Sequence, residues 1–150
     1  MAQIKSHRYT VVDVFTTEPL AGNPLAVFPD ASALGATTMQ KIAKELNLPE
    51  TAFVLPATRK DCAARVRMFT PAREMAFSGH STVGVAFVLL QEKAVPRNSR
   101  ALALEEEVGR IPLRIEAGQR PMIWLRIPPI REGRFYDSSL CAGVLEHFHK

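Results

Sequence analysis

Residues 83–90 (VGVAFVLL) constrain the fold of this chain more than any other segment, because the run contains no charged or amide side chain. A helix built from it is apolar on every side, so other parts of the protein must enclose it. The segments available to do so are predicted to be mostly strands. We therefore expect a sheet that wraps around a central helix.

Stretches rich in β-branched, aromatic and alternating apolar residues predict strands on both sides of this helix. They lie at residues 8–15, 25–29, 51–56, 63–70, 101–106, 109–116 and 121–127, with a loop over 71–80. An amphipathic pattern predicts a second helix over residues 39–46, capped by Thr37 or Thr38 and ended by Pro49. Together these elements predict an α+β fold, a β-sheet wrapped around the central apolar helix.

The composition indicates a soluble globular protein. Of the 150 residues, 47% are hydrophobic and 23% charged, and the longest apolar stretch is too short to span a membrane. The formal net charge is +4, but the basic residues are scattered, so we expect no nucleic-acid partner. Cys62 and Cys141 lie far apart without CxxC spacing, so no metal site is expected. The N-terminus lacks the pattern of a secretory signal, which favours a cytoplasmic location.

A polar cluster directly precedes the apolar run and consists of Ser78, Gly79, His80, Ser81 and Thr82. The first N–H groups of a helix lack intrahelical acceptors, and glycine lets a ligand approach the chain closely, so this helix start can bind an anionic oxygen. His80 adds a hydrogen-bond donor or proton carrier. The competing interpretation is a core helix with an ordinary Ser or Thr cap.

The last residues resemble the beginning of another domain. Pro128 and Pro129 break the strand pattern and are interpreted as a linker. A helix start follows, with Asp137 or Ser138 at its N-cap. We therefore predict an N-terminal domain over residues 1–129, and a linker with the start of a truncated second domain over residues 130–150.

Four segments of the chain, taken together, match the pattern of a known family. They are VDVFTTEPLAGNPLAVF (12–28), MQKIAKELNLPETAFV (39–54), RMFTPAREMAFSGHSTVG (67–84) and the later strands ending in IWLRIPP. In order and spacing they resemble the N-terminal half of the phenazine biosynthesis-like (PhzF) proteins. The resemblance implies a diaminopimelate epimerase-like fold, in which two similar domains face each other across the active site. This chain would supply one member of that pseudo-symmetric pair.

The same resemblance implies roles for individual residues. The glutamate of the family's NLxET motif falls on Glu50, which would be the general acid/base that moves a proton between carbons of a small cyclic or aromatic-like carboxylic acid. The histidine of the GHxT motif falls on His80, the second catalytic residue. No cofactor is expected. The substrate-binding residues would be Asn23, Ser78, Gly79, Ser81 and Thr82.

Three positions depart from the family's common pattern. Pro49 stands where a serine is common, Ser78 where many members have cysteine, and Ser81 where many have proline. These departures bear on the identity of the substrate more than on the type of reaction.

Glu50, taken without the resemblance, fits two interpretations. It can be a solvated carboxylate in a turn. Alternatively, the apolar residues on both sides of it would remove water from the carboxylate, favour its protonated form and suit it to proton transfer near neutral pH. Those residues are Leu48, Pro49, Phe53 and Val54.

The sequence thus predicts an isomerase of the phenazine biosynthesis-like type that transfers protons without a cofactor. The second half of the family carries an acidic-Pro-x-Thr-Gly-Ser motif that no string in these residues matches. We therefore expect the chain alone to lack half of the active site, to be inactive and to form a symmetric homodimer. Two alternatives stay open: an epimerase or racemase, which would need a pair of opposed bases, and a non-catalytic binding or scaffold domain.

Overall fold

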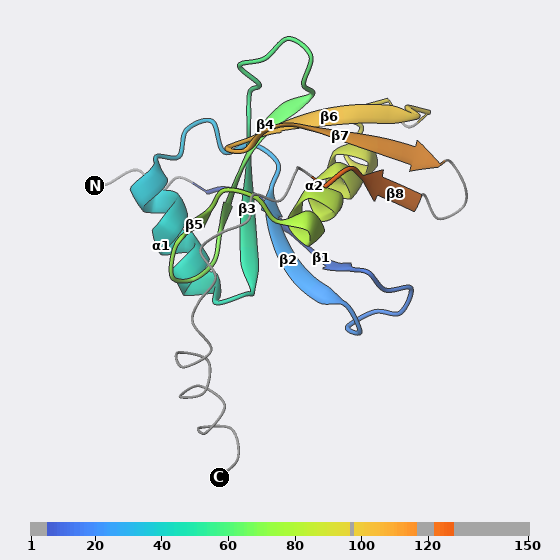
Figure 1. Cartoon of the computed structure of the whole chain (residues 1–150). Coiled ribbons are helices and arrows are strands. Elements are labelled where there is room, and N and C mark those ends of the chain that lie inside the picture. Colours follow the sequence, from blue (N-terminus) through green and yellow to red (C-terminus); the bar gives the residue numbers. More distant parts are fainter. Residues whose placement is uncertain (1–5, 97, 117–121, 128–150) are drawn as a thin grey trace, which may run out of the picture.

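A computed structural model describes residues 6–96, 98–116 and 122–127, which form a mixed sheet and two helices (Figure 1). The helices are α1 (Ala36–Leu46) and α2 (Gly79–Gln91). The strands are β1 (Thr10–Val14), β2 (Asn23–Phe28), β3 (Glu50–Leu55), β4 (Ala64–Phe69), β5 (Glu74–Met75), β6 (Ala101–Glu106), β7 (Gly109–Glu116) and β8 (Met122–Leu125). The strand order is β1-β2-β3-β4-β6-β7-β8, and β5 pairs with β4. The pairs β2–β3 and β4–β6 are parallel and the others antiparallel.

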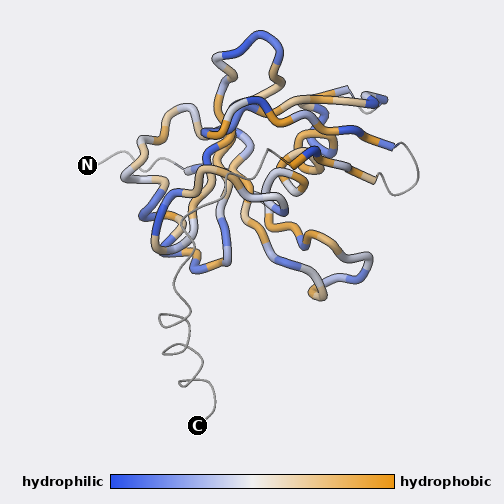
Figure 2. The backbone as a smooth tube through the Cα atoms, viewed as in Figure 1, coloured by the Kyte–Doolittle hydropathy of each residue, from blue (hydrophilic) through white to orange (hydrophobic). Residues whose placement is uncertain are grey.

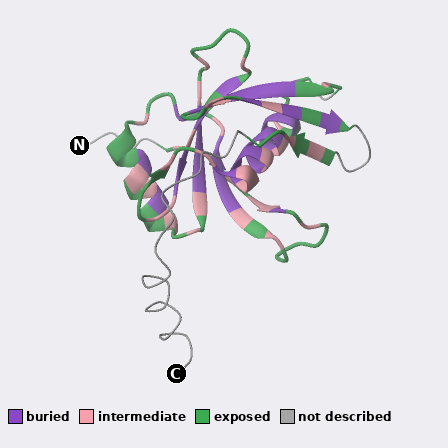
Figure 3. Ribbon diagram, in the orientation of Figure 1, coloured by how far each residue is buried: buried purple, intermediate pink, exposed green. Residues whose placement is uncertain are grey.

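Helix α2 is enclosed by the curved sheet. It contacts β1 and β2 at one end of the strand order and β8 at the other, so the sheet closes around it (Figure 1). Most of its residues are buried (Figure 3). A Cβ atom at Gly84 would lie 2.5 Å from Leu25 Cδ2 and 3.0 Å from Val14 Cγ2, so β1 and β2 pack closely on this part of the helix. The predicted α+β fold with a sheet around an apolar helix is confirmed.

Helix α1 packs on the opposite face of the sheet. Side chains of β3 alternate between the two faces, so Ala52 and Val54 join the cluster around α2 while Phe53 joins the cluster under α1. The Phe53 ring stacks on that of Phe28, with 4.9 Å between the centroids. Met39 of α1 is fully buried against this aromatic group. The predicted amphipathic helix is therefore confirmed.

The start of α1 differs from the prediction. The helix begins at Ala36 after Gly35, whose backbone is extended and which makes no side-chain cap hydrogen bond. Capping by Thr37 or Thr38 is therefore wrong, because both threonines already lie inside the first turn. Glycine is also an accepted residue at this position, so the helix can start earlier than a search for hydroxyl caps indicates.

The end of α1 leads directly into β3. Asn47 adopts the left-handed conformation, with φ of 50°, and its N–H donates to the Ala43 carbonyl over 3.1 Å. Leu48 and Pro49 then connect the helix to Glu50, the first residue of the strand. This short connection fixes where Glu50 enters the sheet.

Some strand boundaries also differ from the prediction. Strand β1 begins at residue 10 and β8 ends at residue 125, so both are shorter than predicted. Residues 74–75, predicted as part of a loop, form β5 against β4. There the Arg67 guanidinium donates to both carboxylate oxygens of Glu74, over 2.6 and 2.7 Å. A two-residue strand is too short to leave a periodic signal in the sequence.

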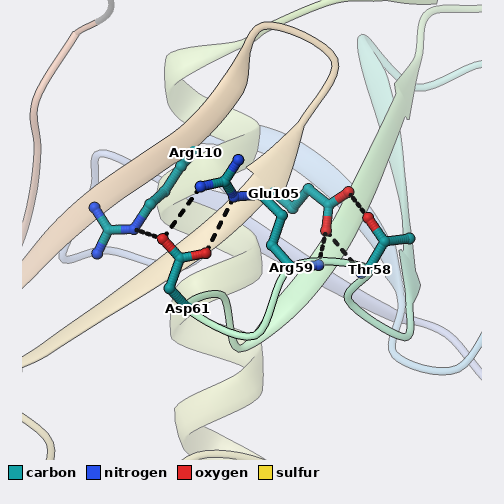
Figure 4. A network of polar contacts seen from close by, with 5 residues as sticks. All are labelled: Thr58, Arg59, Asp61, Glu105 and Arg110. Carbon is teal, nitrogen blue, oxygen red and sulfur yellow. Dashed lines mark hydrogen bonds and ion pairs between the residues drawn. The ribbon is translucent and has the colours of Figure 1, made fainter.

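Polar contacts tie the β3–β4 loop to the β6–β7 hairpin (Figure 4). The Glu105 carboxylate accepts hydrogen bonds from the backbone N–H groups of Thr58 and Arg59, over 2.8 and 3.0 Å. The Asp61 carboxylate lies 3.1 Å from the guanidinium Nε of both Arg59 and Arg110. This loop is hydrophilic, whereas α2 and much of the sheet are largely hydrophobic (Figure 2). The network therefore anchors the loop at the surface.

Several sequence predictions fall outside the described residues. They are the Pro128-Pro129 linker, the helix start at Asp137 or Ser138, the domain boundary between residues 129 and 130, and Cys141. Within the part of the chain that the structure describes, no helix is long and apolar enough to cross a membrane.

Candidate active site

The site begins with Glu50, which lies at the edge of the sheet where β3 starts. Its side chain is 13% exposed, and its Oε2 atom accepts a hydrogen bond from the hydroxyl group of Ser81 in the first turn of α2. In the parallel β2–β3 pair Glu50 lies opposite Leu25, a fully buried residue. The fold thus brings Glu50 to the start of α2.

His80 lies next to this carboxylate. Its Nδ1 atom is 3.8 Å from Glu50 Oε1 and 3.2 Å from the hydroxyl oxygen of Ser78. The imidazole is 11% exposed, and its Nε2 atom is buried without a hydrogen-bond partner among the described residues. Buried polar atoms without a partner are uncommon in folded proteins, so this ring nitrogen marks His80 as a candidate functional residue.

Ser78 holds the N-cap position of α2 but does not act as a cap. Its backbone is extended, with φ of −150° and ψ of 121°, and its side chain makes no cap hydrogen bond. The hydroxyl group lies instead beside the His80 ring. The interpretation of an ordinary Ser- or Thr-capped helix is therefore wrong. The first-turn N–H groups lack intrahelical acceptors and receive no side-chain cap from Ser78.

Gly79 leaves space beside the helix start. A Cβ atom at this position would meet only Leu125 Cδ2, at 3.7 Å, an ordinary contact distance. Since the glycine is partly exposed, a small ligand can approach the backbone from this side. A carboxylate there would accept hydrogen bonds from first-turn N–H groups and meet the positive end of the helix dipole.

Thr82 faces away from that space. It is fully buried, and its hydroxyl oxygen lies 2.6 Å from the Ser78 carbonyl oxygen and 2.8 Å from Glu106 Oε1. Its N–H also donates to the Ser78 carbonyl, over 3.0 Å. These contacts give no support to direct substrate binding by Thr82. The residue instead supports the helix start from the core.

Glu106, the last residue of β6, is the polar residue that sequence reasoning missed. It is 5% exposed, and burial raises the pKa of its carboxyl group to about 7. The segment ALALEE already indicated that Glu106 lies on the buried face, because side chains two residues apart share a face of a strand. Leu102 and Leu104 are buried on the face that Glu106 shares, whereas Glu105 lies on the other side.

Asn23 lies at the same edge of the sheet, as the first residue of β2. The register places it two residues before Leu25, the partner of Glu50 across the parallel pair. Gly22 precedes it, and a Cβ atom there would lie 2.6 Å from the Val14 carbonyl oxygen. The Asn23 side chain is exposed. It therefore lies at the rim of the site, without a hydrogen bond to the other predicted site residues described here.

Cys62 does not approach this site. It follows Asp61 in the β3–β4 loop, which the network of Figure 4 ties to β6 and β7. Burial raises the pKa of its thiol group, which disfavours the thiolate form that a catalytic cysteine needs. This thiol is therefore a poor candidate for one of the opposed bases of a cysteine-dependent racemase.

A sheet closed around an apolar helix, with a sheltered carboxylate and imidazole at the start of that helix, defines an epimerase-like α+β domain. A probable proline racemase from Agrobacterium radiobacter shares this fold, with a TM-score of 0.57 and 18% identity over 74% of this chain and 38% of that one. At this level of identity the likeness concerns the fold alone.

The chain belongs to the phenazine biosynthesis-like family, whose model matches residues 12–140. It is 44% identical over 110 residues to the trans-2,3-dihydro-3-hydroxyanthranilate isomerase of Pseudomonas aeruginosa, covering 73% of this chain and 38% of that protein. The phenazine biosynthesis protein of Bacillus anthracis has a TM-score of 0.75 and 32% identity, over 82% of this chain and 41% of that one. The chain thus spans about two fifths of the length of these relatives.

Proposed function

We propose that this protein is a cofactor-independent isomerase that moves a proton between carbons of a small cyclic or aromatic-like carboxylic acid. The main support is the placement of Glu50, a sheltered carboxylate held by the Ser81 hydroxyl group next to His80. Membership of the family and the isomerase activity for which the Pseudomonas aeruginosa relative is named agree with this proposal.

In the proposed reaction Glu50 exchanges the proton. The Ser81 hydroxyl group donates to Oε2 and fixes the plane of the carboxyl group, which leaves Oε1 on the side of His80. As a carboxylate, Glu50 removes a proton from a substrate carbon, and as a carboxylic acid it returns a proton to another carbon. A residue that shuttles a proton in this way needs no metal or organic cofactor.

His80 and the start of α2 would hold and stabilise the substrate. A hydrogen bond or positive charge from the imidazole offsets the negative charge that develops when the proton leaves carbon. The substrate carboxylate would bind at the first turn of α2 beside Gly79, with Ser78 and Ser81 in the adjoining wall and Asn23 at the rim. Thr82 would contribute by holding Ser78 from the core side.

We further propose that the chain is incomplete as an enzyme and forms a symmetric homodimer in the cytoplasm. The relatives are more than twice as long as the matched segment, so the opposing acid and the second helix start would come from residues that follow. Large apolar side chains are exposed on the β1–β2 connection and on β8, including Phe15 at 75% and Trp124 at 49%. Such surface favours association.

Binding can be tested on the 150-residue chain by NMR. The His80 ring signals are followed while a panel of cyclic and aromatic carboxylic acids is added, each paired with its neutral amide. We expect the acids to shift the His80 signals and the amides to leave them in place. Equal effects of acid and amide would contradict a carboxylate site at this helix start.

Turnover can be tested in a chimera in which residues 12–127 replace the matching segment of the Pseudomonas aeruginosa isomerase. We expect the chimera to isomerise trans-2,3-dihydro-3-hydroxyanthranilate and to incorporate deuterium from D2O at carbon. A folded chimera that binds the substrate without exchanging its protons would point to the non-catalytic binding domain instead.

A further inference from the structure

Glu106 is a buried carboxyl group that the proposed reaction does not use. Its Oε1 atom contacts the Thr82 hydroxyl group over 2.8 Å, and its Oε2 atom is buried without a hydrogen-bond partner among the described residues. Burying an unpaired carboxylate is costly. A carboxyl group kept in this position by the fold therefore needs an explanation, and its one hydrogen-bond partner in the described part of the chain lies in the first turn of α2.

The hydrogen bonds around Thr82 depend on whether Glu106 carries a proton. The Thr82 hydroxyl group has one hydrogen atom but lies within bonding distance of two oxygen acceptors, the Ser78 carbonyl and the Glu106 carboxyl group. When Glu106 is protonated, it can donate to Thr82, which then donates to Ser78. When Glu106 is ionised, it can only accept, so the Thr82 hydrogen turns toward it and the Ser78 carbonyl loses that bond.

Ser78 connects this chain of bonds to the site. Its carbonyl oxygen accepts from Thr82, and its hydroxyl group lies 3.2 Å from His80 Nδ1. The next residues along the same turn are His80, which is 3.8 Å from Glu50, and Ser81, which bonds to Glu50. A change in the Thr82 bonds therefore acts on the segment that carries Ser81 and His80, the two described side chains that contact the Glu50 carboxylate.

We propose that Glu106 is a positioning residue of this site: through Thr82, the protonation of its carboxyl group sets the hydrogen bonding of Ser78 and hence the placement of His80 and Ser81 against Glu50. The inference rests on the proposed roles of Glu50 and His80, but it concerns a coupling that can be measured without turnover.

The surroundings of Glu106 allow it to change its protonation in the physiological range. Burial is the main cause of its raised pKa of about 7, and the Thr82 hydrogen bond acts in the opposite direction. Charged groups on the neighbouring elements have other partners: Arg67 pairs with Glu74, and Arg110 with Asp61. The elements beside β6 also carry Arg65 on β4, His80 on α2, and Arg114 and Glu116 on β7, which pair with each other, while Glu105 and Glu107 are the chain neighbours of Glu106. Within the described structure, none of these groups forms an ion pair with Glu106.

The test is a pH titration by NMR of the full 150-residue chain. The carboxyl carbon of Glu106, the amide groups of Ser78 and Ser81 and the His80 ring are followed from pH 5 to pH 9. We expect the carboxyl carbon to titrate near pH 7. The chemical shifts of the Ser78 and Ser81 amide groups should change with the same midpoint, and this change is called the step below. Amide signals that do not follow the Glu106 titration would overturn the proposal.

Three variants separate this coupling from the titration of His80 itself. Glu106→Gln keeps a donor toward Thr82 but cannot ionise, so the step at Ser78 and Ser81 should disappear. Thr82→Ser keeps the hydroxyl group and should preserve the step, whereas Thr82→Val should remove it while Glu106 still titrates. A step that persists in folded Glu106→Gln would overturn the proposal, even where Thr82→Val does not fold.

Glu105→Gln is the matched control, because Glu105 is the adjacent residue on the same strand but bonds to Thr58 and Arg59. Glu105→Gln should leave the step at Ser78 and Ser81 unchanged. Loss of the step in this variant would contradict a specific role for Glu106. Failure of carboxylic acids to bind beside His80 would count against the proposed function but would leave the coupling itself measurable.

Discussion

At the scale of single residues, Glu50 depends on contacts from a distant part of the chain. Pro49 and the end of α1 bring it to the start of β3, and Ser81, which follows in sequence by 31 positions, donates a hydrogen bond to its carboxylate. An exposed carboxylate in a turn would have no fixed plane. Here the sheet and α2 together fix both the position and the orientation of the proposed acid/base.

Replacing Glu50 by Gln should abolish turnover in the chimera with the Pseudomonas aeruginosa isomerase. The amide keeps the size of the side chain but cannot transfer the proton, so we expect a rate loss of about 100-fold or more. The free energy of unfolding should stay within about 1 kcal/mol of the parent, because the shape is conserved. Initial rates and urea denaturation measure both quantities. If the variant retains a tenth of the parent turnover rate, Glu50 is not the general acid/base.

Variants of His80 should show whether this residue takes part in substrate binding or serves only the fold. His80→Ala removes the donor beside Glu50 and should weaken both acid binding and turnover in the chimera. His80→Asn keeps a donor near the helix start, so it should retain more of the binding than the alanine variant. Isothermal titration and initial rates compare the two. Normal binding and rate in both variants would indicate that His80 serves the fold alone.

Glu106 should make the stability of the chain depend on pH. Because its pKa is raised from 4.5 to about 7 in the folded state, folding favours the protonated carboxyl group, and stability is lost as the pH rises from about 4.5 through about 7. One pKa unit corresponds to about 1.4 kcal/mol, so the loss attributable to this group approaches about 3 kcal/mol. Urea denaturation of the wild type at pH 5 and pH 8 should show the decrease.

Glu106→Gln should remove most of that decrease, since an amide does not ionise. Glu105→Gln should not, because the hydrogen bond from the Thr58 hydroxyl group lowers the pKa of Glu105 and the residue stays ionised across this range. An unchanged pH dependence in Glu106→Gln would show that another group controls stability between pH 5 and pH 8.

The residues of the site differ in how far the sequence predicted them. Glu50 and His80 were predicted because each falls in a short motif, and the structure places them together. The partner of Thr82 was not predicted, because a contact between β6 and α2 leaves no local pattern. The orientation of the Ser78 hydroxyl group was also missed, since residue type at an N-cap does not determine which of two nearby groups the side chain contacts.

At the scale of elements, α2 was the best predicted part of the fold. A helix that is apolar on every side must be enclosed by other elements. The segments around it alternate between apolar and polar residues, so they could enclose it only as a sheet. Strand β5 and the start of α1 were predicted poorly, because they depend on a two-residue pairing and on a glycine cap. Periodicity determines which face of an element is buried but not the residue at which the element ends.

Two glycines of α2 should respond differently to the same substitution. At Gly84 the added methyl group would lie 2.5 Å from Leu25 Cδ2, within a fully buried contact. We expect Gly84→Ala to lower the free energy of unfolding by about 1–3 kcal/mol through overpacking. At Gly79 the nearest atom is 3.7 Å away, so Gly79→Ala should leave stability nearly unchanged.

Chemical denaturation of both variants provides the comparison, and each serves as the control for the other because both add one methyl group to the same helix. Gly79→Ala should nevertheless weaken acid binding, since the methyl group narrows the approach to the backbone. Equal stability of the two variants would contradict the close packing of β1 and β2 on α2.

At the scale of the whole molecule, the described residues expose large apolar side chains at two places. Phe15 and Leu20, which lie in the β1–β2 connection, are 75% and 94% exposed, and Trp124 and Ile127 are 49% and 64% exposed. Both residues of the first pair adopt positive φ angles, 64° and 63°. Holding non-glycine residues in this conformation costs free energy, which a covering partner would help to offset.

The 150-residue chain should therefore self-associate and show no isomerase activity. We expect light scattering to report the mass of a dimer, and we expect no turnover of trans-2,3-dihydro-3-hydroxyanthranilate unless the remaining part of a relative is supplied. Binding of a carboxylic acid at His80 can persist under these conditions. A monomer at all concentrations, or full activity of the chain alone, would contradict this prediction.

The closure of the sheet around α2 also determines when a nascent chain can bury that helix. Strands β1 and β2 leave the ribosome before α2, but β8, which covers its other side, begins about thirty residues after the helix ends. During this interval the helix has an apolar side without its final cover, and pairings between distant segments form slowly. Rapid synthesis would therefore accumulate an aggregation-prone folding intermediate with an uncovered apolar helix. Slower synthesis or binding by a chaperone should increase the yield of folded chain.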